Sequence, residues 1–281
     1  MVNASLASTV TFLGESHDDA TAHYLQEQIL RRTYRPDLAL SLEMFETDIQ
    51  YVLDEYLAGL ITEDHLISSG RAWKNYKTDY RPLVEFAKEH KMPVLAANTP
   101  RRYVNRVSRL GTAALLDLGA GARRFLPPLP CAKASPEYEE KFKQVMEESR
   151  KEEEKRIKET GKTASPALTM DLAKGLEAQN LWDAGMAYSI ANFLTRNPGM
   201  RVLHCTGSFH IAAKLGAVEH LARYRPGVSM LVVTMMSDKS FPEFDIDKMK
   251  GQGDFVIVTD PNIPRSYSIA SSPKSTHSKE K

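Results

Sequence analysis

Two short motifs in this chain place a histidine at the same distance from a glycine. They are Gly14-Glu15-Ser16-His17 and Gly207-Ser208-Phe209-His210, and each follows an apolar run with the character of a β-strand. Glycine permits a tight turn after a strand, and the histidine then falls at the start of the next helix. Ligands of open α/β sheets bind outside the carboxyl ends of the strands. The two turns can therefore face one cavity although they are far apart in the sequence.

Two further polar residues stand where predicted strands end. Glu43 and Asn98 each close an apolar run, so they would add a carboxylate and an amide to the same rim. Imidazole and carboxylate groups together suit a divalent transition metal or an acid/base pair. The alternative is that these polar groups only cap helices and satisfy loop carbonyls. The residues offered as metal ligands or catalytic groups are Glu15, His17, Glu43 and His210.

Other residue types suggest further sites, each with a structural alternative. Cys205 follows His204 in an apolar run, but neighbours in a strand point to opposite faces, which favours a buried structural cysteine over a nucleophile. Tyrosines and tryptophans near the helical stretches could line a flat aromatic ligand, with a phenolate bound to iron, or could fill the core. Arginines after Pro100 could pair with carboxylates or propionates, or form a solvated helix face. These arginines are Arg101, Arg102, Arg106 and Arg109.

Six short apolar runs must position these turns. Their composition is that of strands buried on both faces, and the amphipathic helical stretches between them are long enough for crossover connections. The runs are 10–13, 38–42, 93–97, 201–205, 229–235 and 255–258. This alternation predicts an α/β fold with a mostly parallel β-sheet flanked by helices.

The stretch 126–184 interrupts the alternation. Closely spaced prolines at its start end any preceding helix, and a charged helical stretch with an apolar stripe through Tyr138 and Phe142 follows. We therefore expect a smaller helical insertion at 126–184 within a discontinuous α/β domain, 8–125 and 185–262.

Charge patterns mark two other segments. The run 150–156 contains only charged residues of both signs, which favours a solvated helix with ion pairs at i,i+4 spacing. The alternative is an interaction scaffold that uses the charged helix 137–158. The polar tail, 265–281, has the composition of a disordered segment.

The composition excludes several classes of protein. The chain has 281 residues with 37 Lys and Arg against 36 Asp and Glu, so it lacks the basic excess typical of proteins that bind nucleic acid. Two cysteines are too few for a disulfide framework, and no apolar run approaches the ~20 residues that cross a bilayer. We expect a soluble protein without a transmembrane segment, in the cytoplasm or in an organelle interior such as the plastid stroma unless a targeting segment has been removed.

Several motifs, taken in order along residues 10–235, resemble a known family. The chain is similar to the haem-binding uptake proteins named ChaN in bacteria. The motifs are FLGESH at 12–17, LEMF at 42–45, Trp73 with Tyr80, LAAN at 95–98, QNLWD at 179–183 with Met186-Ala187, and GSFH at 207–210.

The resemblance implies a parallel α/β domain with a smaller helical domain, haem bound near their junction, and often a dimer. It also implies a tyrosine ligand for the haem iron, with basic or histidine side chains meeting the propionates. We expect a homodimer that handles haem or iron by binding, sequestration or transfer. Tyr138 and Tyr188 are the preferred ligand candidates. The other candidates for haem contact are Asn98, Arg101 and Trp182.

The paired G-x-x-H turns also look like those of Tiki-type metalloproteases, TraB-like proteins and erythromycin esterases. In these relatives the matching positions serve hydrolytic or metal chemistry, which would make Glu15, His17, Glu43 and His210 the polar centre. A metal-dependent hydrolase of the esterase or peptidase type is therefore the alternative to a haem-binding protein.

Overall fold

Six parallel strands form the centre of the fold in the computed structural model, which describes residues 1–161 and 171–266. The strand order is β3-β2-β4-β1-β5-β6, and every neighbouring pair is parallel. All six predicted strands are confirmed. They are β1 (Val10–Glu15), β2 (Leu38–Glu46), β3 (Val94–Asn98), β4 (Arg201–Gly207), β5 (Met230–Ser237) and β6 (Phe255–Thr259).

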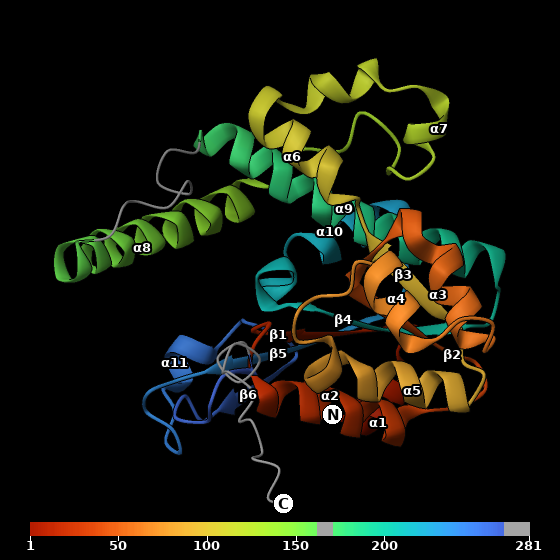
Figure 1. The fold of residues 1–281 in the computed structure, drawn as a ribbon. Coiled ribbons are helices and arrows are strands. Elements are labelled where there is room, and N and C mark those ends of the chain that lie inside the picture. Colours follow the sequence, from red (N-terminus) through yellow and green to blue (C-terminus); the bar gives the residue numbers. More distant parts are fainter. Residues whose placement is uncertain (162–170, 267–281) are drawn as a thin grey trace, which may run out of the picture.

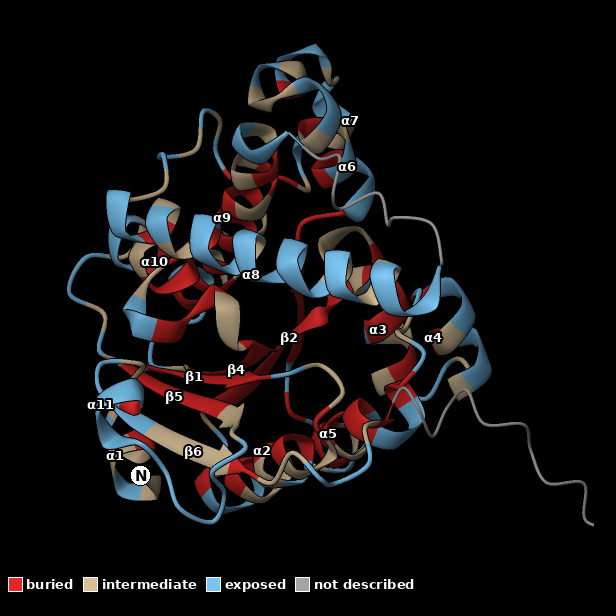
Figure 2. Ribbon diagram, turned by 90° about the vertical axis from the view of Figure 1, so that its left-hand side faces the viewer, coloured by how far each residue is buried: buried red, intermediate tan, exposed pale blue. Residues whose placement is uncertain are grey.

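Helices cover both faces of this sheet (Figure 1). One face packs against α2 (Ala20–Thr33), α3 (Gln50–Leu57), α4 (Glu63–Ser69) and α5 (Arg81–Glu89), whose apolar side chains form one cluster with β2. The other face packs against α9 (Leu172–Arg196) and α10 (Ala217–Tyr224). Because both faces are covered, the central strands are buried along almost their whole length, which explains their apolar sequences (Figure 2).

A smaller apolar cluster lies beyond the sheet. It joins α6 (Arg101–Leu110) and the 3₁₀ turn Thr112–Asp117 to the first half of α9. The expected insertion boundary at residue 184 falls inside α9, which runs without a break from this cluster onto the sheet. The short helix α7 (Ala120–Arg123) lies in the same part of the molecule as α6 (Figure 1).

The helix α8 (Pro136–Thr160) projects away from the rest of the protein (Figure 1). Ser135 caps its first turn, and only Tyr138 and Phe142 on its apolar stripe are buried. The charged part is a helix with pairs at i,i+4 spacing, as the sequence predicts; Lys151 lies 3.6 Å from Glu147.

The remaining elements are short. They are α1 (Val2–Ala7), α11 (Ile246–Met249), the π-helical turn Tyr76–Tyr80, and the 3₁₀ turns Thr47–Ile49, Ser208–His210 and Ala212–Lys214. Within 1–161 and 171–266, no helix is both long and apolar enough to span a membrane. The expected disordered tail lies outside the described residues from position 267 onward.

Candidate functional site

Three adjacent strands bring the predicted polar residues to one edge of the sheet. In the order β2-β4-β1, Glu43 lies on β2, His210 follows β4, and Glu15 ends β1 just before His17. The Cα of Glu15 pairs with that of Gly207, so both G-x-x-H turns leave the sheet at the same level. The structure thus brings together two histidines that are far apart in the sequence.

Glu43 stands between the two imidazole rings. Its Oε1 lies 3.8 Å from Nε2 of His17 and 3.5 Å from Nε2 of His210. Its Oε2 accepts hydrogen bonds from the Thr206 hydroxyl and the Gly207 backbone N–H, both at 2.7 Å. The carboxylate is therefore fixed by β4 and presents its free oxygen to both rings.

His17 is held from several sides but still reaches solvent. Its Nδ1 lies 3.0 Å from Oε1 of Glu15, and Trp73 packs edge-on against its ring at a centroid distance of 4.6 Å. Its backbone carbonyl accepts from the Asn75 amide at 2.6 Å and lies 3.2 Å from Nε2 of His23. The side chain of His17 is 37% exposed, whereas those of Glu15, Glu43 and His210 are buried.

His210 has a second carboxylate partner, which the sequence analysis did not assign. Its Nδ1 lies 2.6 Å from Oδ1 of Asp183, and the other oxygen of Asp183 accepts from the Tyr138 hydroxyl. Gln179 lies one turn earlier on α9, with its amide nitrogen 3.4 Å from the His210 ring. The i,i+4 spacing of these two polar residues, which places them on one face of the helix, is the sequence signal that could have identified them.

Gly207 allows the two rings to approach. A Cβ atom at this position would lie 2.9 Å from Cε1 of His17 and 3.6 Å from Cδ2 of His210. The first distance is shorter than a carbon–carbon contact allows, so any larger residue would displace His17.

The charges in this cluster shift its pKa values in opposite directions. Burial alone would lower the pKa of both histidines, but the carboxylates around them outweigh burial. Glu15 and Glu43 raise the pKa of His17 to about 9, and Glu43 and Asp183 raise that of His210 to about 10. Burial would raise the pKa of Glu43, but the two imidazolium charges and the Thr206 hydrogen bond hold it well below its usual range. Both rings are therefore cationic at neutral pH.

This donor arrangement does not fit the predicted divalent metal. Across the described parts of the chain, no group of three or more His, Cys, Asp or Glu side chains has the geometry to hold a metal ion.

The haem-contact candidates lie in different surroundings. Tyr138 is buried, and its hydroxyl is engaged by Asp183, so it cannot reach iron without breaking that bond. Tyr188 packs against Tyr224 with ring centroids 5.6 Å apart. Trp182 is half-buried, with its ring 6.4 Å from that of His210.

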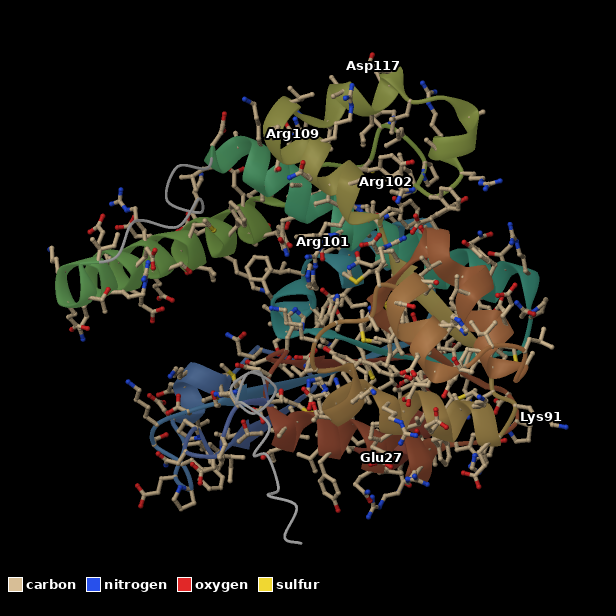
Figure 3. All side chains as sticks on the ribbon, in the orientation of Figure 1. Glu27, Lys91, Arg101, Arg102, Arg109 and Asp117 are labelled. Carbon is tan, nitrogen blue, oxygen red and sulfur yellow. The ribbon has the colours of Figure 1, made fainter. Side chains whose placement is uncertain are left out.

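Asn98 and Arg101 lie at the end of β3 and the start of α6. Asn98 is buried, and its Oδ1 has no hydrogen-bond partner among the described residues. Arg101 is exposed and forms no ion pair within the described ranges, unlike Arg102, which pairs with Asp48. Figure 3 shows Arg101 between α6 and the sheet, whereas Arg109 lies at the outer end of that helix.

Cys205 and His204 are structural, as their strand position predicts. Cys205 is buried, and burial raises the pKa of its thiol, so it is not a nucleophile. His204 is buried beside the Ser41 hydroxyl at 2.9 Å, and burial lowers its pKa to about 4.

Comparison with known proteins identifies the family. A family model described as haem-binding uptake, Tiki superfamily, ChaN matches residues 1–221, which include the whole histidine cluster. The chain belongs to this family. No curated protein matches it significantly.

Solved structures support the fold assignment. The structure that describes cofacial haem binding to ChaN of Campylobacter jejuni covers 91% of this chain and 89% of that chain, with 20% identity and a TM-score of 0.62. Two other structures are more distant. The type III effector HopBA1 is 10% identical, covers 92% of this chain and 91% of that chain, and has a TM-score of 0.46. A mutant of the erythromycin esterase EreC is 10% identical, covers 84% of this chain and 71% of that chain, and has a TM-score of 0.44. The ChaN likeness confirms the expected α/β fold, and the two distant likenesses carry no functional argument.

Proposed function

We propose that this chain binds haem as its cargo beside the partly exposed side chain of His17. The observation that carries the proposal is its membership of the ChaN family, because the family match spans the complete cluster around Glu43. The ChaN structure that shares this fold is described with cofacially bound haem.

The side chains around His17 suit both the flat macrocycle and the propionates of haem. Trp73 and Trp182 are half-buried aromatic side chains beside the two histidines, and such rings pack favourably against a flat macrocycle. His17 is cationic, and Arg101 has no acidic partner among the described residues, so both suit carboxylate groups. We therefore assign these two residues to the haem propionates rather than to the iron.

Titration of the apoprotein with haemin tests the proposal. We expect a saturable Soret shift at micromolar haemin, and His17→Ala and Arg101→Ala should each weaken binding by roughly tenfold, the usual effect of losing a charge-assisted hydrogen bond. The matched controls are His65→Ala and Arg109→Ala, which remove exposed side chains. Figure 3 shows Arg109 at the outer end of α6. A folded protein that gives no Soret shift would reject the proposal.

The His210 contacts favour a second candidate, an acid/base hydrolase. An imidazole held between Asp183 and Glu43 resembles the arrangements that move protons in hydrolysis, and Oε2 of Glu15 is buried without a partner in the described structure. This candidate expects turnover of simple esters that a chelator does not inhibit and that His210→Ala and Asp183→Asn abolish. Ester turnover equal to that of a boiled sample would eliminate it.

We also propose the homodimer and an intracellular or organellar location that the sequence analysis expects. The mass in solution by light scattering tests the first, with 31.5 kDa for one chain and twice that value for the dimer. A single 31.5 kDa species with and without haemin would contradict the dimer.

A further inference from the structure

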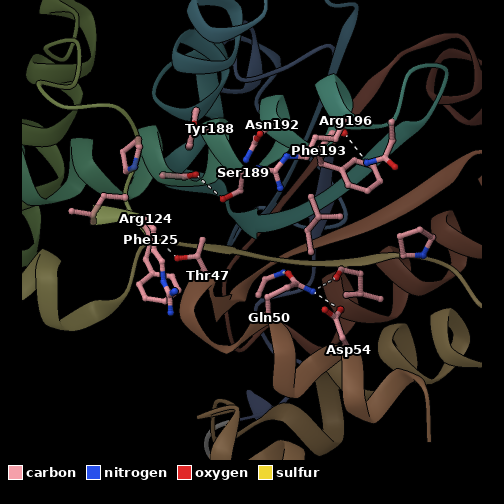
Figure 4. Close-up of a pocket in the computed structure, with 18 of the residues that line it drawn as sticks. Thr47, Gln50, Asp54, Arg124, Phe125, Tyr188, Ser189, Asn192, Phe193 and Arg196 are labelled. Carbon is pink, nitrogen blue, oxygen red and sulfur yellow. Dashed lines mark hydrogen bonds between the residues drawn. The ribbon is translucent and has the colours of Figure 1, made fainter. Parts of the chain in front are cut away.

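A trough of about 600 Å³ lies at the outer edge of the sheet, away from the histidine cluster. Val94, Leu95 and Ala96 of the edge strand β3 form its floor, and side chains of α3 and α9 form its walls (Figure 4). No residue of the histidine cluster lines it. Its volume is within the range of small-molecule sites.

The edge of β3 is already closed by a side chain, which excludes an added peptide strand. The Gln50 amide donates to the Val94 carbonyl at 2.8 Å and accepts from the Ala96 N–H at 2.7 Å. Ser189 donates its hydroxyl to the Ala97 carbonyl at 2.9 Å. Strand addition needs such backbone groups free, so a small molecule fits the trough better than an extended peptide.

Two arginines lie at opposite ends of the trough. Figure 4 shows Arg124 beside Phe125 at one end and Arg196 beside Phe193 at the other. Neither guanidinium makes an ion pair or hydrogen bond with any described residue. That of Arg124 lies over the Phe125 ring, 4.6 Å from its centroid.

The length of the trough limits the length of a ligand. The wall between the two ends spans Gly185 to Arg196 of α9, which is about 16 Å at the rise of an α-helix. The acidic residue of the lining is Asp54, whose carboxylate accepts from the Gln50 amide at 2.9 Å. Between the arginines the lining includes Leu57, Val94, Leu95 and Phe193, so the middle of the trough can take an apolar body.

We propose that the trough binds an elongated organic dianion, an α,ω-dicarboxylate with an apolar middle. One carboxylate pairs with Arg124 and the other with Arg196, while the chain between them lies on the floor formed by β3. This site is separate from the haem site proposed above and does not depend on it.

Calorimetric titration with decanedioate tests the proposal on the full chain. We expect one saturable site, and Arg124→Gln and Arg196→Gln should each weaken it by roughly tenfold or more, because each removes a charge-assisted pair. Arg109→Gln, an exposed arginine outside the trough, is the matched control and should bind as the wild type does. Decanoate, with one carboxylate, should bind roughly tenfold more weakly than decanedioate.

A filling variant and a haemin titration complete the test. Asn192→Trp places a large ring in the trough and should abolish decanedioate binding without lowering the unfolding temperature. Absence of saturable decanedioate binding, or equal binding by the two trough arginine variants and the wild type, would overturn the assignment. The two variants should bind haemin normally; weakened haemin binding would mean that the trough belongs to the haem site.

Discussion

At the residue scale, Glu43 determines the character of the centre because it holds two cationic rings that would otherwise repel each other. Its position depends on two donors from β4, Thr206 and the Gly207 N–H. Gly207 therefore serves twice, since its backbone anchors the carboxylate and its missing side chain leaves room for His17.

The first prediction concerns this glycine. Gly207→Ala should displace His17 and cost about 1–3 kcal/mol of unfolding free energy, because the new Cβ would lie 2.9 Å from the ring. Urea unfolding measures the cost. Gly119→Ala is the control, since no atom lies within 4 Å of a Cβ there. Equal stability of the two variants would show that the rings do not approach as described.

A second prediction follows from the raised histidine pKa values. The native state keeps protons on His17 and His210 up to about pH 9 and 10, whereas an unfolded histidine loses its proton near 6.5. Stability from these groups is therefore complete below pH 6.5 and is lost as pH rises. Lys141, whose pKa burial lowers to about 8, opposes the loss above pH 8.

The unfolding free energy should thus fall between pH 6.5 and 9, on the order of a few kcal/mol. His17 contributes less than its pKa suggests, because water screens the ion pairs of a side chain that is 37% exposed. Urea titrations at pH 6.5, 7.5 and 9 measure the change, and His210→Gln should reduce it. A flat profile in the wild type would contradict the ion-pair network.

The third prediction tests whether Tyr138 has a structural role or is a ligand of the haem iron. Tyr138→Phe removes the hydroxyl that Asp183 accepts from and should cost about 1–3 kcal/mol of stability. Because that hydroxyl is buried, the haemin Soret spectrum of the folded variant should match that of the wild type. A loss of the Soret shift would instead restore Tyr138 as the iron ligand.

At the element scale, α9 connects the parts of the molecule that matter for function. One face carries Gln179 and Asp183 to His210, and Ser189 further along donates to the β3 backbone. By contrast, the buried residues of α8 lie in its first turns, where Phe142 packs near Phe209 with ring centroids 6.4 Å apart.

The fourth prediction tests this attachment. Phe142→Ala should cost about 3–5 kcal/mol and should loosen the first turns of α8, because Phe142 is one of its two buried residues. Hydrogen exchange of the α8 amides and urea unfolding would report both effects. Val145→Ala, on the same helix but exposed, should change stability by less than about 0.5 kcal/mol.

At the scale of the whole molecule, the sequence predicts the sheet well because buried parallel strands are continuous apolar runs. The two G-x-x-H turns were predictable for the same reason, since they mark where those runs end. Asp183 was not assigned, because its i,i+4 spacing from Gln179 shows that the two share a helix face but not which strand end that face meets. The burial of Tyr138 was likewise hidden, since a stripe on a helix does not reveal its partner. The predicted metal is not supported by the described residues, because spacing along the chain does not fix the geometry in which the side chains meet.

The amide of Gln50 has a consequence for the behaviour of the protein in concentrated solution. An uncovered outer strand is a template onto which other polypeptides can align, and repeated alignment leads to fibres. Gln50 already bonds the Val94 carbonyl and the Ala96 N–H, so another strand cannot pair with these groups in the middle of β3. Self-assembly through this side of the molecule is thereby discouraged by a single uncharged side chain.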